Sequence, residues 1–221
     1  MRLKPRIVAV LGKNAVRDIP QASEADMIEV RLDLVEGNPL KVMKSIRGAT
    51  SLPLIATNRW MVEGGSFKGT EKERMDLLCR ASEYADFVDI ELRADLKEEL
   101  MGRIDKPVIV SYHDFTRMPS LEELRSTLRE ISETGASIAK IAVTPGCLKD
   151  NLTLLDFLLK ANTPLCVIAM GELGRHLRAI APIYGSVLTY GYVSEATAPG
   201  QMSVSELKQL QSLLGPPTGI L

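Results

Sequence analysis

Eight short runs rich in valine and isoleucine recur along the 221-residue chain, with longer amphipathic stretches between them. Most runs are apolar on both faces, as parallel strands buried on two sides should be. Their ranges are 6–12, 27–33, 52–58, 87–93, 107–113, 137–143, 164–170 and 185–191. Eight β-then-α units in succession predict an α/β fold, a compact (β/α)8 TIM barrel, since such barrels usually have about 250 residues. An open doubly wound sheet is the alternative, but the first βα turn lacks G-x-G-x-x-G and no Walker A sequence occurs.

Helix start signals lie between the runs. Three are capping boxes, in which a hydroxyl side chain at the N-cap precedes a glutamate three residues on. They begin at Thr70, Ser120 and Ser203 and predict helices over 71–85, 121–135 and 205–215. The leucine spacing of NLTLLDFLLKAN predicts a further helix that stops before Pro164. One domain over residues 1–221 is expected, with a frayed tail from about residue 215.

Charge and composition exclude several classes of protein. The formal net charge of −1 argues against a nucleic-acid binder, which would carry a basic surplus. The apolar runs are too short to span a bilayer, and the N-terminal segment reads as a strand and not as a signal peptide. The three cysteines, Cys79, Cys147 and Cys166, are far apart and form no C-x-x-C motif. The sequence therefore predicts a cytoplasmic protein with reduced thiols.

Charged and polar side chains gather near the carboxyl ends of the predicted strands, where barrel enzymes carry their chemistry. Some have a structural explanation: Glu91 and Arg93 could form an ion pair, and His113 could be a packing histidine. His176 is expected on an exposed helix face, and Gly64–Gly65 as a flexible turn. The residues at these strand ends are Glu29, Arg31, Asn58, Arg59, Glu91, Arg93, His113, Lys140, Arg175, His176, Arg178, Thr197 and Gln201.

Lys140 stands at the centre of the apolar run SIAKIAV. A buried ammonium is costly unless it is paired. One explanation is an ion pair inside the barrel, with Glu29 or Glu91. The other is a lysine whose pKa is lowered by desolvation and nearby cations, so that its free amine attacks carbonyls and forms Schiff bases. His113, on the preceding strand, titrates near neutrality and could move the protons. The residues alone thus indicate a Schiff-base barrel enzyme that acts on a small anionic carbonyl compound.

Several segments resemble those of one enzyme family, the type I 3-dehydroquinate dehydratases, or 3-dehydroquinases. The chain contains that family's E-x-R-x-D strand and R-x-x-x-E-G-G segment, its catalytic-histidine motif SYHDF, its lysine strand and its closing loop with APGQ. The matches follow family order along almost the whole chain. In this sequence they are EVRLD (29–33), NRWMVEGGSFKG (58–69), SYHDF (111–115), KIAVTP (140–145) and GSVLTYGYVSEATAPGQ (185–201).

The resemblance implies a hydro-lyase of the shikimate pathway to chorismate and aromatic amino acids, which dehydrates 3-dehydroquinate to 3-dehydroshikimate. It implies that Lys140 forms the imine, that His113 moves protons and that Glu63 orients His113. No metal or cofactor is required, and a homodimer is expected because bacterial members are often dimers. The substrate contacts implied by the resemblance come from Glu29, Arg31, Arg59, Arg178, Thr197 and Gln201.

Two features of the sequence depart from the family pattern, and two other functions remain open. RIVAVLG lacks the serine that bacterial members carry on the first strand, and Thr197 stands where the family often has serine. A class I aldolase-type barrel also uses a lysine on strand six, although SYHDF and APGQ disfavour it. A non-catalytic binding barrel, in which Lys140 is only an ion-pair partner, would need a depleted site.

Overall fold

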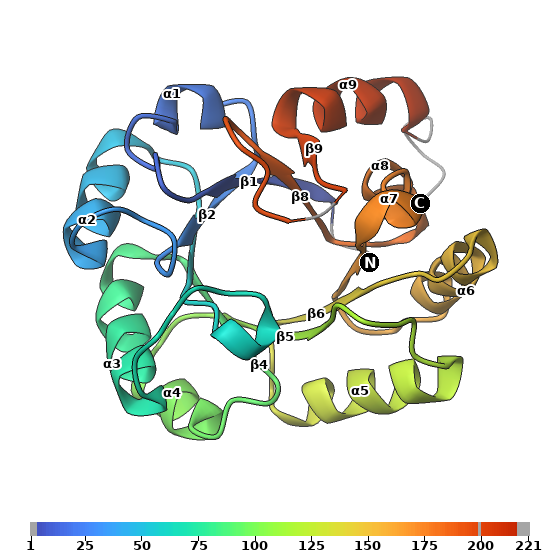
Figure 1. Cartoon of the computed structure of the whole chain (residues 1–221), viewed down its shortest axis with the longest axis horizontal. Helices are drawn as coiled ribbons and strands as arrows, with labels where there is room; N and C mark the ends of the chain where they lie inside the picture. Colours follow the sequence, from blue (N-terminus) through green and yellow to red (C-terminus); the bar gives the residue numbers. More distant parts are fainter. Residues whose placement is uncertain (1–3, 199, 216–221) are drawn as a thin grey trace.

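The strands form one curled parallel sheet in the computed structural model, which describes residues 4–198 and 200–215 (Figure 1). Its order is β7-β6-β5-β4-β3-β2-β1-β8-β9, and every paired neighbour is parallel. The predicted (β/α)8 barrel is therefore confirmed. The strands are β1 (Arg6–Leu11), β2 (Met27–Arg31), β3 (Leu54–Thr57), β4 (Phe87–Glu91), β5 (Val108–Asp114), β6 (Ile138–Val143), β7 (Leu165–Ala169), β8 (Leu188–Tyr192) and β9 (Met202–Ser203).

The barrel closes between β7 and β8 with the help of a serine side chain. Ser186 Oγ accepts the Val167 N–H at 3.1 Å and lies 2.9 Å from the Leu188 carbonyl, to which it donates. One backbone hydrogen bond, from Val187 N–H to the Leu165 carbonyl at 2.9 Å, joins the same two segments. A buried hydroxyl thus replaces part of the backbone ladder at this seam, which satisfies polar groups that would otherwise be left without a partner.

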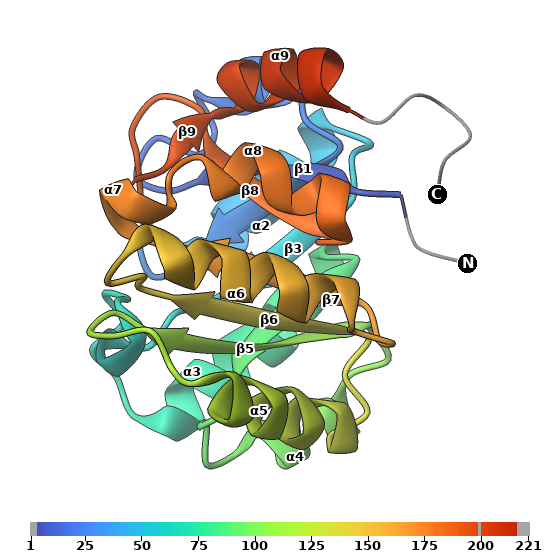
Figure 2. The same cartoon turned by 90° about the vertical axis from the view of Figure 1, so that its right-hand side faces the viewer.

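Helices surround the sheet on its outer side, and the strands all run toward one end of the barrel (Figures 1 and 2). The capping boxes of α3, α5 and α9 form as predicted, with Thr70, Ser120 and Ser203 as N-caps. The helices are α1 (Ile19–Ala22), α2 (Pro39–Ala49), α3 (Glu71–Ala81), α4 (Lys97–Arg103), α5 (Leu121–Glu133), α6 (Leu148–Leu159), α7 (Gly171–Gly174), α8 (Leu177–Ile180) and α9 (Val204–Leu214). Short 3-10 turns are η1 (Met61–Glu63), η2 (Ser82–Tyr84) and η3 (Ala181–Tyr184).

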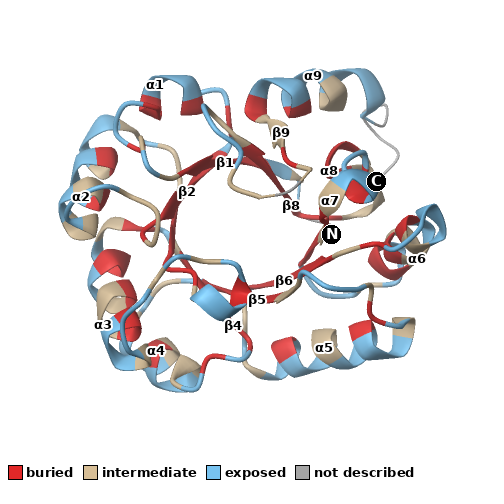
Figure 3. Ribbon diagram, in the orientation of Figure 1, coloured by how far each residue is buried: buried red, intermediate tan, exposed pale blue. Residues whose placement is uncertain are grey.

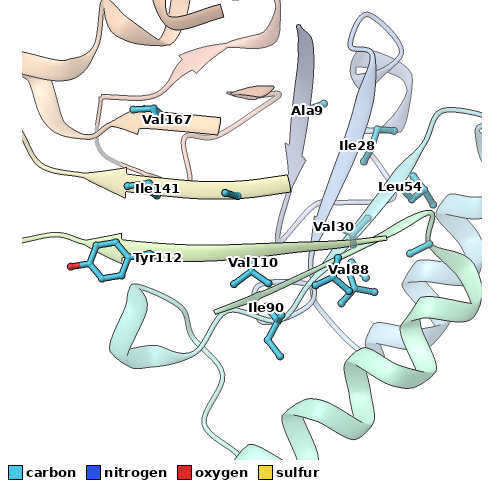
Figure 4. Packing of buried hydrophobic residues seen from close by; sticks show 14 of the residues in the cluster. Ala9, Ile28, Val30, Leu54, Val88, Ile90, Val110, Tyr112, Ile141 and Val167 are labelled. Carbon is cyan, nitrogen blue, oxygen red and sulfur yellow. The ribbon is translucent and has the colours of Figure 1, made fainter. Parts of the chain in front are cut away.

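Successive residues of each strand serve two different apolar cores. Outward-facing residues such as Val30, Ile90 and Ile141 pack beneath the helices in one large cluster (Figure 4). The alternate residues, among them Val8, Met27 and Ile138, form a smaller cluster. The strands are accordingly buried on both faces, whereas the helices show exposed outer sides (Figure 3). Burial on both sides explains why the strand sequences are apolar almost throughout.

Boundaries differ in a few places from those expected. The helix predicted over 71–85 ends at Ala81 and continues as η2, and α6 begins at Leu148, ahead of the predicted leucine pattern. The two-residue strand β9 was not predicted, since a segment so short carries no periodicity. The tail predicted from about residue 215 lies, from 216 on, outside the described residues. In the described part of the chain, no helix is long and apolar enough to cross a membrane.

Candidate active site

The barrel interior changes from apolar to charged along three of the strands, β2, β4 and β6. Side chains two residues apart share a face of a strand. Met27 on β2 is therefore followed by Glu29 on the same face, and Ile138 on β6 by Lys140. The same step occurs on β4, where Asp89 follows Phe87. The polar layer lies toward the carboxyl ends of the strands, as expected for a barrel enzyme.

A cavity opens above this layer and receives all nine predicted site residues. The nine residues come from six separate places: β2, the loop after β3, β5, β6, α8 and the loop after β8. Only the closed barrel brings them together. The wall also contains residues that the sequence did not single out, notably Phe115, Met170 and Tyr190. The lining is Val10, Glu29, Arg31, Arg59, Glu63, Gly64, His113, Phe115, Lys140, Ala142, Ile168, Met170, Arg178, Tyr190, Thr197, Ala198 and Gln201.

Lys140 lies in the floor of the cavity, 4 % exposed. Its Nζ donates to Asp89 Oδ2 at 2.9 Å and lies 3.4 Å from Glu29 Oε1. The sequence predicted that Lys140 pairs with Glu29 or with Glu91. The pairing with Glu29 is confirmed, and the pairing with Glu91 is wrong. The arrangement around Nζ is that of an ammonium, so the amine must release a proton before it can attack a ketone.

Asp89 is the centre of the buried charge network, and the sequence analysis missed it. Arg59 Nη2 lies 2.7 Å from Asp89 Oδ1, and the Ser111 hydroxyl donates to the same oxygen at 2.7 Å. Burial acts to raise the pKa of Asp89, but Arg59 and Lys140 outweigh it and hold the pKa below its usual range. Asp89 shares a strand face with Glu91, so the period-2 pattern of FVDIELR was the signal that could have found it.

Replacing Asp89→Asn is expected to destabilise the fold by about 3–5 kcal/mol, because it leaves Arg59 and Lys140 buried without their shared counter-charge. The depressed folded-state pKa also gives a sign for the pH dependence. The Asp89 carboxylate's contribution to the free energy of unfolding is fully present above the pKa of about 3.9 that it has in the unfolded chain. It is lost as pH falls toward the lower pKa of the folded state. Urea unfolding of both proteins at pH 7 and pH 3 measures this. A gap in unfolding free energy that does not shrink at pH 3 would contradict the assignment.

The predicted ion pair between Glu91 and Arg93 does not form. Glu91 Oε1 lies 3.0 Å from Arg59 Nη1, and its other oxygen pairs with Arg74, which is fully buried. Arg93 lies instead over the Tyr112 ring, 4.8 Å from its centroid. Glu91 and Arg93 are two residues apart, but Arg59, from the loop after β3, and Arg74, from α3, bring two cations to the Glu91 carboxylate. Glu91 thus fixes the position of Arg59 at the cavity wall.

His113 and Glu63 form the second catalytic candidate. His113 Nδ1 lies 2.8 Å from Glu63 Oε2, and both side chains are largely buried. Burial, together with Arg59 and Lys140, lowers the pKa of His113 well below 6.5, so the imidazole is neutral at pH 7. A neutral ring that donates Nδ1–H to the Glu63 carboxylate leaves Nε2 unprotonated. That nitrogen can then serve as a general base.

Burial raises the pKa of Glu63 to about 7, although Arg59 opposes the shift. Below that pH a protonated Glu63 can donate to Nδ1, which moves the imidazole hydrogen to Nε2 and removes the base. We therefore expect kcat/KM to fall about tenfold per pH unit below pH 7. In a Glu63→Gln variant this fall of kcat/KM at acid pH should vanish, and kcat/KM at pH 7 should be about 10²-fold lower. A pH–rate profile of both enzymes tests this, and an unchanged acid limb in the variant would exclude Glu63 as its origin.

Close packing fixes the loop that carries Glu63, including the Gly64–Gly65 turn. A Cβ on Gly65 would lie 1.9 Å from the Arg59 carbonyl oxygen, so only glycine fits there. Gly64 has φ +76° and packs beneath the Phe115 ring. Asp33, which forms a two-bond ion pair with Arg31, also accepts the Arg59 N–H at 3.2 Å. The turn expected to be flexible is thus fixed against the barrel rim.

Three further predicted residues complete the far wall of the cavity. Arg178 on α8 is buried, and burial lowers its pKa to about 10, so it remains a cation at neutral pH. Gln201 Oε1 accepts the Thr197 N–H at 2.8 Å and lies 3.2 Å from the Thr197 hydroxyl. This side chain therefore holds its own loop against the cavity.

His176 and the three cysteines lie outside the cavity lining. His176 is exposed at the start of α8, as predicted. Cys166 is buried on β7, Cys79 is half-buried on α3, and Cys147 is exposed immediately before α6. In the described ranges, no group of three or more His, Cys, Asp and Glu side chains could hold a metal ion.

Comparison with known proteins decides the family. The family model of type I 3-dehydroquinase matches residues 8–216. The chain belongs to this family. It is 50% identical over 218 residues to the 3-dehydroquinate dehydratase of Methanothrix thermoacetophila, which covers 97% of this chain and 95% of that protein.

Solved structures of 3-dehydroquinate dehydratases superpose closely on this chain. The 3-dehydroquinate dehydratase of Geobacillus kaustophilus gives a TM-score of 0.86 at 27% identity, covering 95% of this chain and 91% of that one. The type I enzyme of Clostridium difficile, solved with covalently modified comenic acid, gives 0.85 at 30% identity, covering 96% and 92%. These matches and the family model confirm the resemblance seen in the sequence.

Proposed function

We propose that this chain dehydrates 3-dehydroquinate to 3-dehydroshikimate through a Schiff base on Lys140. The observation that carries the proposal is one cavity in which a buried lysine amine and a histidine held by a carboxylate meet. Family membership supports the reaction, because the matching relatives are 3-dehydroquinate dehydratases. The reaction places the enzyme in the shikimate pathway, and a cytoplasmic location is part of the same proposal.

The reaction begins when the deprotonated Lys140 amine adds to the C3 ketone. Loss of water and uptake of a proton then give the protonated imine. This cation withdraws electrons and makes the C2–H acidic enough for His113 to remove its proton. The resulting enamine expels the C1 hydroxyl, which takes the proton back from His113 and leaves as water. Hydrolysis of the imine releases the product and restores the lysine.

Charged groups around the cavity match the substrate's functional groups. Glu29, Arg31 and Arg59 line the cavity and hold substrate hydroxyls and the ring. Arg178 binds the carboxylate, since a desolvated cation gains most from an anionic partner. Thr197 and Gln201 cover the substrate from the last loop.

Product identity separates this function from its alternatives. We expect 3-dehydroquinate to yield a conjugated enone, seen as rising ultraviolet absorbance and as the loss of one water by mass. An aldolase-type barrel would give two carbon fragments instead, and a binding barrel would return the substrate unchanged. Either of these results from folded protein would overturn the proposal. The homodimer stays a prediction, which analytical ultracentrifugation can test.

A further inference from the structure

One cavity residue that the reaction scheme does not use lies directly against the lysine. Tyr190, on β8, is 3% exposed, and its ring lines the cavity. Lys140 Nζ lies 4.1 Å from the ring centroid. The ammonium is therefore enclosed by two carboxylates, Asp89 and Glu29, and by the face of one aromatic ring.

The two kinds of contact depend on different properties of the nitrogen. An ammonium has three N–H groups and can serve both carboxylates. Once the imine has formed, Nζ keeps one N–H, so at most one of its hydrogen bonds to Asp89 and Glu29 can persist. The attraction to the Tyr190 ring depends on positive charge over the ring face and needs no N–H. It can therefore act on the ammonium and on the protonated imine alike.

We propose that Tyr190 is a positioning residue whose ring face holds the positive charge of Lys140 in the ammonium and in the protonated imine. The proposal rests on the Schiff-base function above. The contact has its full strength here because the site is desolvated. A second effect is positional: the ring leaves the amine only the open side of the cavity from which to meet a ketone.

The Tyr190 hydroxyl does not share this role. It makes no hydrogen bond within the described part of the chain. Burial, with Glu29 nearby, raises its pKa well above 10, so the phenol stays neutral at neutral pH. A buried hydroxyl without a partner costs stability. Tyr190→Phe should therefore keep the activity within about threefold and leave the melting temperature equal or higher.

The test compares variants that keep, remove or weaken the ring face. Tyr190→Phe keeps it, and Tyr190→Leu removes it. A series with one, two or three fluorines on a phenylalanine at position 190 weakens the ring's attraction for cations at nearly constant shape. We expect kcat and the rate of borohydride trapping with 3-dehydroquinate to fall stepwise along the series, and about tenfold or more in Tyr190→Leu, with little change in KM.

A flat fluorine series, in variants that melt like the phenylalanine protein, would overturn the role of the ring. So would a folded Tyr190→Leu variant with unchanged kcat. Failure of the Schiff-base function itself gives a different result, since the unmodified protein would then show no trapped adduct. Loss of activity in Tyr190→Phe alone would assign the effect to the hydroxyl and also contradict the proposal.

Discussion

A Lys140→Met variant is expected to fold and to lose turnover of 3-dehydroquinate by about 10⁴-fold or more. Methionine keeps an unbranched side chain of similar length but has no amine, so no imine can form. The fold should survive because each carboxylate keeps a partner: Asp89 retains Arg59 and Ser111, and Glu29 retains the Thr57 hydroxyl at 2.9 Å. Enone absorbance measures the turnover, and circular dichroism with thermal melting checks the fold.

Lys41→Met is the matched control for this variant. Lys41 is an exposed lysine on α2 and is not part of the cavity lining, so the same substitution there should leave kcat unchanged. A folded Lys140→Met protein that keeps a substantial part of the turnover would return Lys140 to a purely structural role. The structural and catalytic interpretations differ most clearly in this pair of variants.

The second large effect concerns proton transfer. His113→Asn should lower kcat by about 10²–10⁴-fold, the usual contribution of a general acid–base, while Lys140 still forms an adduct with the substrate. Asparagine can still contact Glu63 but cannot accept a proton from C2. Turnover and borohydride trapping, measured side by side, separate the two steps, and the mass of the trapped adduct tells whether dehydration preceded the block.

The chain offers its own control, since His176 is the only other histidine. It is exposed at the start of α8, and His176→Asn should behave like the unmodified protein. If His113→Asn turned over at the unmodified rate, the base would have to be another group of the cavity. If it formed no adduct at all, His113 would be required already for imine formation.

Local patterns predicted most of the fold. The eight strands follow from runs buried on both faces, and the starts of α3, α5 and α9 follow from capping boxes, whose hydrogen bonds join residues only three apart. The strand that was missed, β9, depends on pairing with β8, a partner outside its own segment. Barrel closure through Ser186 is of the same kind, because an isolated serine before a strand gives no sign that its hydroxyl will accept the Val167 N–H from β7.

Family motifs predicted the nine cavity residues, whereas the partners that hold them were harder to find. The sequence offered Glu29 or Glu91 for Lys140, and the choice depends on which strands face each other across the barrel. Asp89 takes the central place and Glu91 pairs with Arg59 and Arg74. Tyr190 reads as an ordinary core residue of β8 until its ring is seen against Nζ. Such contacts join strands far apart in sequence, and no periodicity encodes them.

The most direct test of the account is borohydride trapping of the imine. The protein is mixed with 3-dehydroquinate, reduced, and analysed as intact protein and as peptides by mass spectrometry. We predict one ligand adduct per chain, on the peptide that carries Lys140, and none on a sample reduced without ligand. Folded protein that converts the substrate yet yields no adduct, or carries it on another lysine, would contradict the assignment of Lys140 as the Schiff-base nucleophile.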